Sequence, residues 1–411
     1  MIVIMIMRMV TRSRMGLGRL AAAGAVVLAM GVLGLGAPLD AAAQQKTPIK
    51  VGASLSLTGQ LSRSGVEQEH GYKLWEQEVN ARGGLLGRPV ELVLYDDKSD
   101  PATGAKLYEK LITVDKVDLL EGPYSSPVTK AASAITEKYR FPMLSTGGSA
   151  RDIFERGFRY IFQVATPSEY YMVGAVEIGA KHGGKTMVVV SENTVFTQEC
   201  AKGAQEHGKK LGIQTLHYEE YSRGVTDLAP LILKTKQLKP DMFIACTYGP
   251  EAILFTRQMK DLDFAPKLFG FSVGVALPDY AKGLGQDAEA VFGSSQWEPG
   301  ARLPGAKEFA EKFRKAFNFE PSYHAAQGYV GGQLVEKAVN ETKSLDKEKI
   351  RDYLARLDTV TLYGRYKVND KGLQIGKPAY LIQVQDGRRV IVWPDDAAEA
   401  KYIYPFPGWK R

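Results

Sequence analysis

Two short polar segments contain residue types suited to binding an anion. Segment 124–127 (YSSP) follows a predicted strand, with Ser126 placed to cap the next helix and Pro127 in its first turn. Segment 145–149 (STGGS) follows the next predicted strand, where Gly147 lets the backbone approach a ligand beside the Ser149 hydroxyl. Hydroxyls and open amides at the carboxyl ends of neighbouring strands suit a carboxylate. A plain helix cap and an ordinary turn explain the same residues, so both interpretations stay open.

Aromatic residues cluster after predicted strands in the second half of the chain. Phe196, Tyr248 and Phe271 each follow a strand end, and Tyr170 and Tyr171 open a helix. Such residues are typical of the apolar wall of a ligand pocket. Core packing explains any one of them equally well.

A third segment matches a hydrolase pattern. Segment 270–274 (GFSVG) fits the G-x-S-x-G nucleophile elbow, with Ser272 as the nucleophile. Segment 275–278 is a poor helix start, and His182 reads as a helix C-terminus. His324, the only downstream base, falls inside a predicted helix. We therefore predict that the chain is not an enzyme, and a secreted esterase using Ser272 is the distant alternative.

Nothing in the sequence predicts a cofactor or a metal. The chain contains no G-x-G-x-x-G or Walker A pattern for a nucleotide. Its 5 His and 2 Cys show no metal-ligand spacing. Cys200 and Cys246 are the two thiols, and the sequence leaves open whether they pair or stay free.

The N-terminus predicts export. Residues 1–43 combine a basic start, an apolar run over 20–37 and small residues at Ala41 and Ala43, which is typical of a cleaved signal peptide. A membrane anchor is the other interpretation of this run. These residues hold four Arg and one Asp, so their removal lowers the formal charge from +7 to +4. Because basic and acidic residues alternate along the remaining helical stretches, no nucleic-acid partner is expected.

The elements that must position these residues alternate between strands and helices, which predicts parallel α/β sheets. Strands are predicted at 49–57, 90–95, 117–120, 141–144, 186–190, 214–218, 242–246 and 267–271. Helices are predicted at 65–81, 101–114, 127–138, 167–181, 197–211, 226–237 and 250–262. After Pro299, helices at 306–317, 324–342 and 347–357 precede short strands at 364–368 and 379–385, the last turning at Asp386-Gly387. Eight such steps favour two open sheets over one, with a barrel as the rival.

Four segments carry a family resemblance. They are IKVG (49–52), LTG (57–59), VNARGGLLGR (79–88) and YDDKSDP (95–101). Together they closely resemble the leucine/isoleucine/valine-binding proteins, which are type I periplasmic binding proteins that feed ABC importers. The combination of the last two segments is specific, and the resemblance runs over nearly the whole predicted mature chain.

The resemblance implies two Rossmann-like lobes joined by three hinge crossovers near Thr166, Pro299 and Gly376. Lobe 1 would comprise 46–166 plus 299–375, and lobe 2 would comprise 167–298 plus 376–411. Such lobes close on a ligand about their hinge.

The resemblance also implies site residues. Ser126, Gly147 and Ser149 match positions that hold the ligand α-carboxylate in the family, and Phe196 and Tyr248 match aromatic positions on the second lobe. Ser272 stands where leucine-type binders place the Glu that pairs with the ligand ammonium. Because a hydroxyl cannot replace that charge, either Glu192, Glu251 or another acid substitutes, or the ligand has no ammonium group.

The resulting expectation is a periplasmic, monomeric solute-binding protein that delivers a small carboxylate-bearing ligand to the membrane permease of an ABC importer. A branched-chain or other hydrophobic amino acid is the first expectation for the ligand. Small aromatic acids or amides are the alternative. Arg63, beside loop 58–64, is expected at the surface rather than on a second carboxylate.

Overall fold

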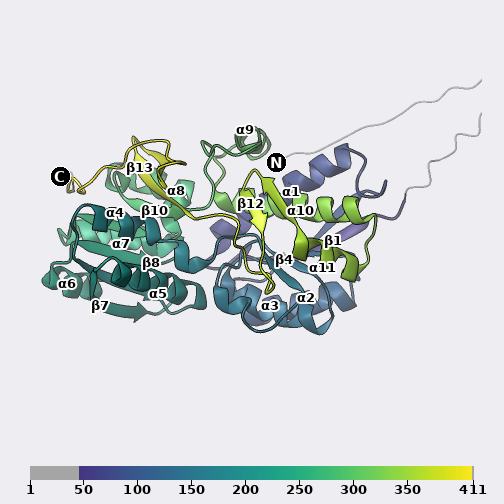
Figure 1. The fold of residues 1–411 in the computed structure, drawn as a ribbon, viewed down its shortest axis with the longest axis horizontal. Helices are drawn as coiled ribbons and strands as arrows, with labels where there is room; N and C mark the ends of the chain where they lie inside the picture. The colour runs from purple at the N-terminus through teal and green to yellow at the C-terminus, as the bar shows by residue number, and fades with distance from the viewer. Residues whose placement is uncertain (1–45, 410–411) are drawn as a thin grey trace, which may run out of the picture. The chain divides into compact units, whose positions relative to one another are not determined.

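Two separate sheets organise the chain (Figure 1). The structure is a computed structural model that describes residues 46–409, so the predicted signal peptide over 1–43 lies outside the described residues. Within 46–409, no helix is both long enough and apolar enough to cross a membrane. The prediction of two open, mainly parallel sheets is confirmed, and the barrel alternative is wrong.

The first sheet has five parallel strands in the order β2-β1-β3-β4-β5. They are β1 (Ile49–Leu55), β2 (Val90–Asp96), β3 (Leu119–Glu121), β4 (Met143–Ser145) and β5 (Ile161–Gln163). Adjacent strand residues belong to different apolar clusters, with Leu119 and Leu144 in one and Leu120 and Met143 in the other. Both faces of this sheet are therefore covered, as parallel sheets require.

Helices from two distant parts of the chain cover the first sheet. They are α1 (Ser62–Ala81), α2 (Pro101–Thr113), α3 (Ser126–Lys138), α9 (Ala306–Phe317), α10 (Tyr323–Thr342) and α11 (Lys347–Arg356). Helices α1 and α10 pack so closely that a Cβ added to Gly71 would lie 2.1 Å from the carbonyl oxygen of Ala325. A short hairpin, β11 (Asp358–Thr361) and β12 (Gly364–Lys367), follows α11.

The second sheet has seven strands in the order β14-β13-β10-β9-β8-β6-β7. They are β6 (Thr186–Glu192), β7 (Gln214–Tyr221), β8 (Met242–Cys246), β9 (Leu268–Phe271), β10 (Phe292–Ser295), β13 (Tyr380–Gln385) and β14 (Arg388–Trp393). Strands β6 to β10 pair in parallel, whereas β13 is antiparallel to β10 and to β14. The predicted turn at Asp386-Gly387 joins β13 to β14 and is confirmed.

Helices also cover both faces of the second sheet. They are α4 (Val173–Lys181), α5 (Val195–Lys210), α6 (Ala229–Leu238), α7 (Gly249–Asp261) and α8 (Pro278–Leu284). Met187 and Val189 of β6 pack in one apolar cluster with α4 and α5, and Val188 and Val190 pack in another with α6 and α7. This alternation follows from the two-residue period of a strand.

The main difference from the predicted elements lies at 167–181. The structure replaces one predicted helix by a 3-10 turn over Ser168–Tyr170 and then α4, because the backbone of Met172, at φ −106° and ψ 7°, interrupts the helix. Strands β5, β10, β11 and β14 and helix α8 were not predicted.

The segments that carry the family resemblance have structural roles. Asn80 exchanges hydrogen bonds of 2.7 and 2.8 Å with the backbone of Val90, which ties the end of α1 to the start of β2. Asp96 accepts hydrogen bonds from the amides of Leu57 and Thr58. Asp97 accepts from the hydroxyls of Ser54 and Ser56. These residues fix the loop after β1, and none of them lines the cavity described next.

Candidate ligand-binding site

A small cavity of about 10 Å³, room for about one water molecule in this structure, lies where the carboxyl ends of strands from both sheets meet. Residues after β3 and β4 line it from the first sheet, and residues after β6, β8 and β9 line it from the second. The lining residues are Tyr124, Ser125, Ser126, Gly147, Ser149, Tyr171, Phe196, Tyr248, Val273, Tyr323 and Gln327. Five of the six sequence-predicted site residues are among them, and Ser272 is not.

The Ser126 hydroxyl has a different role from the predicted helix cap. Ser125 occupies the cap position of α3, and Ser126 is the first helical residue. The Ser126 Oγ accepts hydrogen bonds of 3.0 Å from the amides of Ser149 and Ala150. Because this oxygen accepts twice, its own proton is available as a donor to the cavity, and the two accepted bonds strengthen it in that role.

Gly147 holds the two polar loops together. A parallel bridge pairs Tyr124 with Gly147, which extends the pairing of β3 and β4 into the loops. A Cβ added to Gly147 would lie 2.6 Å from the carbonyl oxygen of Pro123 and 2.8 Å from the Cα of Tyr124. The close approach of the backbones therefore requires glycine at this position.

Ser125 is a lining residue that the sequence reasoning did not propose. Its backbone has φ 77°, a region that residues other than glycine rarely adopt. Its hydroxyl is buried and makes no hydrogen bond. A strained backbone and a free hydroxyl, both facing the cavity, are typical of a site that holds a ligand.

Aromatic rings form most of the remaining lining. The Phe196 ring lies 5.3 Å from the ring of Tyr171 and 5.2 Å from that of Tyr248, centroid to centroid. Tyr124 and Tyr323 contribute from the first-sheet side. All five side chains are nearly inaccessible to solvent. The cavity therefore favours a ligand with an apolar or aromatic body.

Two lining residues come from α10, far away in the sequence. Tyr323 and Gln327 are one helical turn apart, so both reach the cavity from the same helix face. The Gln327 amide donates to Gln68 Oε1 at 3.1 Å and accepts from the Tyr363 hydroxyl at 3.1 Å. The only sequence signal for these two residues was their spacing of four, which places them on one helix face. Residues that pack in a hydrophobic core have the same spacing, so it does not identify a cavity.

No lining side chain carries a charge at neutral pH. His324 lies behind Tyr124, with its Nε2 3.2 Å from the phenol oxygen. Burial lowers the pKa of His324 to about 3, so the imidazole is neutral. A ligand carboxylate in this cavity would be held by neutral hydroxyl and amide donors.

The acids considered as substitutes for the ammonium partner are not in the lining. The Glu192 Oε1 accepts a 2.6 Å hydrogen bond from Nε of Arg223, so an internal cation already neutralises this carboxylate. Glu251 lies at the start of α7, and its Oε2 is buried without a hydrogen bond. Burial raises the pKa of Glu251 to about 7.

Ser272 is buried beneath the cavity. Its Oγ donates to the carbonyl oxygen of Thr247 and accepts from the Thr247 amide, both at 2.9 Å. This pairing ties the ends of β8 and β9 together, while Val273 lines the cavity instead. A 3-10 turn over Gly274–Ala276 follows, although the sequence predicted no helical start there. His324 does lie in a helix, as predicted, and contacts Tyr124 and Ser322.

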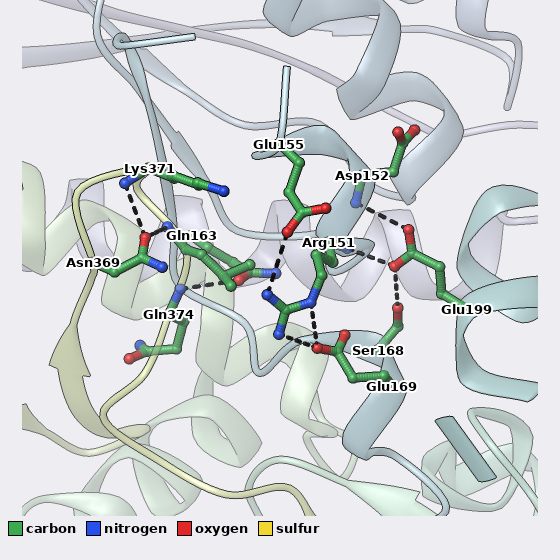
Figure 2. A network of polar contacts seen from close by, with 11 residues as sticks. Arg151, Asp152, Glu155, Gln163, Ser168, Glu169, Glu199, Asn369, Lys371 and Gln374 are labelled. Atoms are coloured by element: carbon green, nitrogen blue, oxygen red, sulfur yellow. Dashed lines mark hydrogen bonds and ion pairs between the residues drawn. The ribbon is translucent and has the colours of Figure 1, made fainter. Parts of the chain in front are cut away.

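Arg151 and Asp152, which follow the polar loop at 145–149, are anchored to helix α5 of the second sheet (Figure 2). Glu199 of α5 accepts from the amides of Arg151 and Asp152 at 2.6 and 2.9 Å, and from the Ser168 hydroxyl at 3.1 Å. Gln163 donates to the carbonyl oxygen of Ser149 at 3.0 Å and accepts from the amide of Gln374 at 3.0 Å. The polar loop is thereby coupled to two of the segments that connect the sheets.

Three further residues from the sequence analysis, Arg63, Cys200 and Cys246, lie outside the cavity lining. Arg63 pairs with Asp279 at 2.5 Å and with Glu67 at 3.5 Å, and its side chain is 36% exposed. Cys200 and Cys246 are both buried and free, so the alternative in which they pair is not seen.

Comparisons with known proteins show the family of this chain and its fold. Residues 48–389 match the family model described as periplasmic binding protein. The Leu/Ile/Val-binding protein homolog 7 of Brucella suis biovar 1 is 26% identical over 399 residues, covering 91% of this chain and 98% of that protein.

Two solved structures show the same fold. The branched-chain amino acid transporter substrate binding protein LivJ from Streptococcus pneumoniae, in complex with isoleucine, has a TM-score of 0.76 at 23% identity and covers 87% of this chain and 100% of its own. A solute binding protein from R. palustris, in complex with benzoate, has a TM-score of 0.76 at 20% identity and covers 86% of this chain and 100% of its own. With its type I fold and a family-model match over most of its length, this chain belongs to the periplasmic binding protein family, whose members bind substrates outside the cytoplasm.

Proposed function

We propose that this protein is the solute-binding component of an ABC importer and binds a small carboxylate whose body is apolar or aromatic. The observation that carries the proposal is the uncharged cavity, in which the Ser126 hydroxyl and aromatic rings from both sheets face one another. The protein would leave the cytoplasm by means of residues 1–43, act in the periplasm as a monomer, and deliver its ligand to a membrane permease.

The missing acid favours a ligand without an ammonium group. A buried ammonium requires a charged partner, because its desolvation is otherwise uncompensated. Ser272 has both hydrogen-bonding directions occupied by Thr247, and Glu192 is paired with Arg223. The solved R. palustris relative in complex with benzoate supports the same ligand class.

Closure of two lobes would bury the ligand. The cavity is lined from both sheets, so a ligand that fills it stabilises the closed arrangement through contacts on both sides. We propose the hinge crossovers near residues 166, 299 and 376, with lobes 46–166 plus 299–375 and 167–298 plus 376–411. The importer would then recognise the closed, loaded state.

A hydrophobic amino acid is the second candidate. The Leu/Ile/Val-binding homologue from Brucella and the LivJ complex with isoleucine favour it. Binding an amino acid here would require Glu251 to turn its free carboxylate oxygen toward the cavity.

A thermal-shift panel tests the proposal. The purified mature protein is heated with straight-chain and branched fatty acids of four to six carbons, benzoates, primary amides and amino acids, because a bound ligand raises the melting temperature by mass action. Carboxylates should raise it, and the shift should shrink in Ser126→Ala. No shift with any compound, together with ester hydrolysis abolished by Ser272→Ala, would overturn the binding function.

A further inference from the structure

Four consecutive backbone amides, in segment 149–152, donate hydrogen bonds in two pairs to two side chains. The first two amides donate to Oγ of Ser126, both at 3.0 Å. The amide of Arg151 donates to Oε2 of Glu199 at 2.6 Å, and the amide of Asp152 donates to Oε1 of Glu199 at 2.9 Å. One acceptor is a cavity-lining hydroxyl, and the other is a carboxylate outside the lining.

These two acceptors come from different sheets. Ser126 begins α3, which follows β3 of the first sheet, whereas Glu199 lies in α5, which follows β6 of the second sheet. Segment 149–152 follows β4 of the first sheet, and its last two residues begin the 3-10 turn Arg151–Ile153. The two bonds to Glu199 therefore join the first-sheet side of the cavity to the second-sheet side (Figure 2).

Helix α5 also carries a cavity-lining ring beside Glu199. Phe196 lines the cavity and precedes Glu199 by three residues, so the two side chains are neighbours on one helix face. A movement of α5 away from the first sheet would withdraw the Phe196 ring from the cavity and break both bonds to Glu199 together. The bonds can therefore exist only while α5 closes this side of the cavity.

Glu199 is held in position on the second-sheet side. The Ser168 hydroxyl donates to its Oε2 at 3.1 Å. Helix α5 packs directly on the 3-10 turn that begins at Ser168, because a Cβ added to Gly203 would lie 2.1 Å from the carbonyl oxygen of Glu169. The Arg151 side chain crosses to the same turn, where its Nε donates to Oε1 of Glu169 at 2.7 Å. The Glu199 carboxylate is therefore preorganised to accept the two amides.

The bonds to Glu199 belong to a strong class of hydrogen bond. An ionised acceptor makes a bond from an amide shorter and stronger than a bond between neutral groups. The Glu199 side chain is half-buried, so solvent competes less for it. By contrast, the ion pair of Arg63 and Asp279, which also joins the two sides, has side chains that are 36% and 50% exposed and is screened by solvent.

We propose that Glu199 is a positioning residue that holds the two sides of the cavity together and thereby slows the release of a bound ligand. This inference rests on the proposed function, because it requires the two sides to separate when the ligand leaves. Glu199 acts through segment 149–152 and α5, without touching the ligand itself. A ligand enters while the sides are apart and the bonds are absent, so loss of Glu199 should change the dissociation rate and not the association rate.

Stopped-flow measurements of intrinsic fluorescence test the inference, with benzoate and 4-methylpentanoate as the probes. Glu199→Gln keeps the size of the side chain, but its amide nitrogen cannot accept, so one backbone amide loses its acceptor. Glu199→Ala leaves both amides without one. The dissociation rate constant should rise about tenfold in Glu199→Gln and further in Glu199→Ala, while the association rate constant stays within about threefold of wild type.

Glu206→Gln is the matched control for these variants. Glu206 lies on the same helix, is 62% exposed and pairs with Lys202 at 3.9 Å, so both wild-type rate constants should be kept. Amide hydrogen exchange of the ligand-free protein measures the bonds themselves. The amides of Arg151 and Asp152 should exchange about tenfold or more faster in Glu199→Ala than in wild type, because their acceptor is gone.

The outcomes separate the two proposals. If neither carboxylate binds the wild type, the proposed function fails and the inference fails with it. If they bind but both Glu199 variants keep the wild-type dissociation rate, the inference is wrong and the function stands. Slower association with unchanged dissociation would contradict the inference, since Glu199 would then shape the open site. Equal exchange of the two amides in wild type and Glu199→Ala would also contradict it. Glu199→Gln keeps the test decisive even where Glu199→Ala does not fold.

Discussion

The two sides of the cavity differ in how far their buried polar atoms are paired in hydrogen bonds. On the first-sheet side, the Ser126 oxygen accepts two amides and Gln327 is held by Gln68 and Tyr363, whereas the buried Ser125 hydroxyl makes no hydrogen bond. On the second-sheet side, the Tyr248 hydroxyl in the lining makes no hydrogen bond, and neither do Nη2 of Arg223, Oε2 of Glu251 and the phenol oxygen of Tyr221 outside the lining. Without a ligand, the first side therefore has more of its polar groups paired than the second.

This difference suggests a division of labour between the sides. A preorganised set of donors binds the group that all ligands share, because nothing has to be rearranged when it arrives. Unpaired atoms discriminate between ligands, because a ligand that fails to satisfy them leaves their full desolvation cost in place. The first side would thus bind the carboxylate, and the second would select the ligand.

The largest expected effect comes from a substitution that forces apart the two polar loops on the first-sheet side. Gly147→Val places atoms against the Pro123 carbonyl oxygen and the Tyr124 backbone, at Cβ distances of 2.6 and 2.8 Å. Ligand affinity should fall by about 100-fold or more, because the two polar loops must separate. Titration calorimetry with the best carboxylate measures this change. Gly283→Ala is the matched control, since nothing lies within 4 Å of its added Cβ, and an equal loss there would contradict the prediction.

The next effect removes a single hydroxyl from the same side. Ser126→Ala leaves the amides of Ser149 and Ala150 without their acceptor and removes the donor to the ligand. Combined with Ser149→Ala, it should weaken carboxylate binding by roughly 2–4 kcal/mol. Ser344→Ala removes a hydroxyl that is not in the cavity lining and is the control. Its affinity for the carboxylate, measured in the same way, should equal that of the wild type. Unchanged affinity in the double variant would place the carboxylate elsewhere.

The buried Glu251 carboxyl on the second-sheet side should make the free energy of unfolding depend on pH. The pKa of Glu251 is raised from 4.5 to about 7 in the folded protein. The folded state therefore holds a proton that the unfolded state releases, and this contribution to stability is lost as pH rises from about 4.5 to 7. Glu251→Gln should thus gain up to about 3 kcal/mol relative to wild type between pH 5 and pH 8.

Urea unfolding of the ligand-free protein at pH 5 and pH 8 measures this difference. Glu155→Gln, an exposed acid outside the cavity lining, is the control. Parallel stability curves for Glu251→Gln and wild type would show that Glu251 is charged in the folded protein throughout this pH range and would contradict the prediction.

The smallest effect is expected from the ion pair of Arg63 and Asp279. It joins a helix of the first sheet to one of the second, but its side chains are 36% and 50% exposed. Exposed pairs contribute about 0–1 kcal/mol, so Arg63→Ala should weaken ligand binding by no more than about fivefold. A loss as large as that of Gly147→Val, measured by the same calorimetry, would mean that Arg63 contacts the ligand.

The sequence predicted the sheets and the polar loops better than the roles of single residues. Buried β-branched strands and proline-started helices are local patterns, so both sheets and the loops at 124–127 and 145–149 were recognisable. The sequence predicted that Ser126 caps helix α3. In the structure Ser125, with its positive φ, occupies the cap position, so the helix starts one residue earlier and Ser126 is its first residue. Tyr323 and Gln327 were missed, since only the packing of α10 on α1 brings them to the cavity.

We expect the cavity to bind a carboxylate without an ammonium group. Leucine and 4-methylpentanoate differ only by that ammonium group, so titration calorimetry of this pair at neutral pH tests the claim directly. We predict that 4-methylpentanoate binds at least about tenfold tighter, because no lining side chain compensates the buried charge. Tighter binding of leucine would contradict the account and would assign an acid, with Glu251 the first to test, to the ligand.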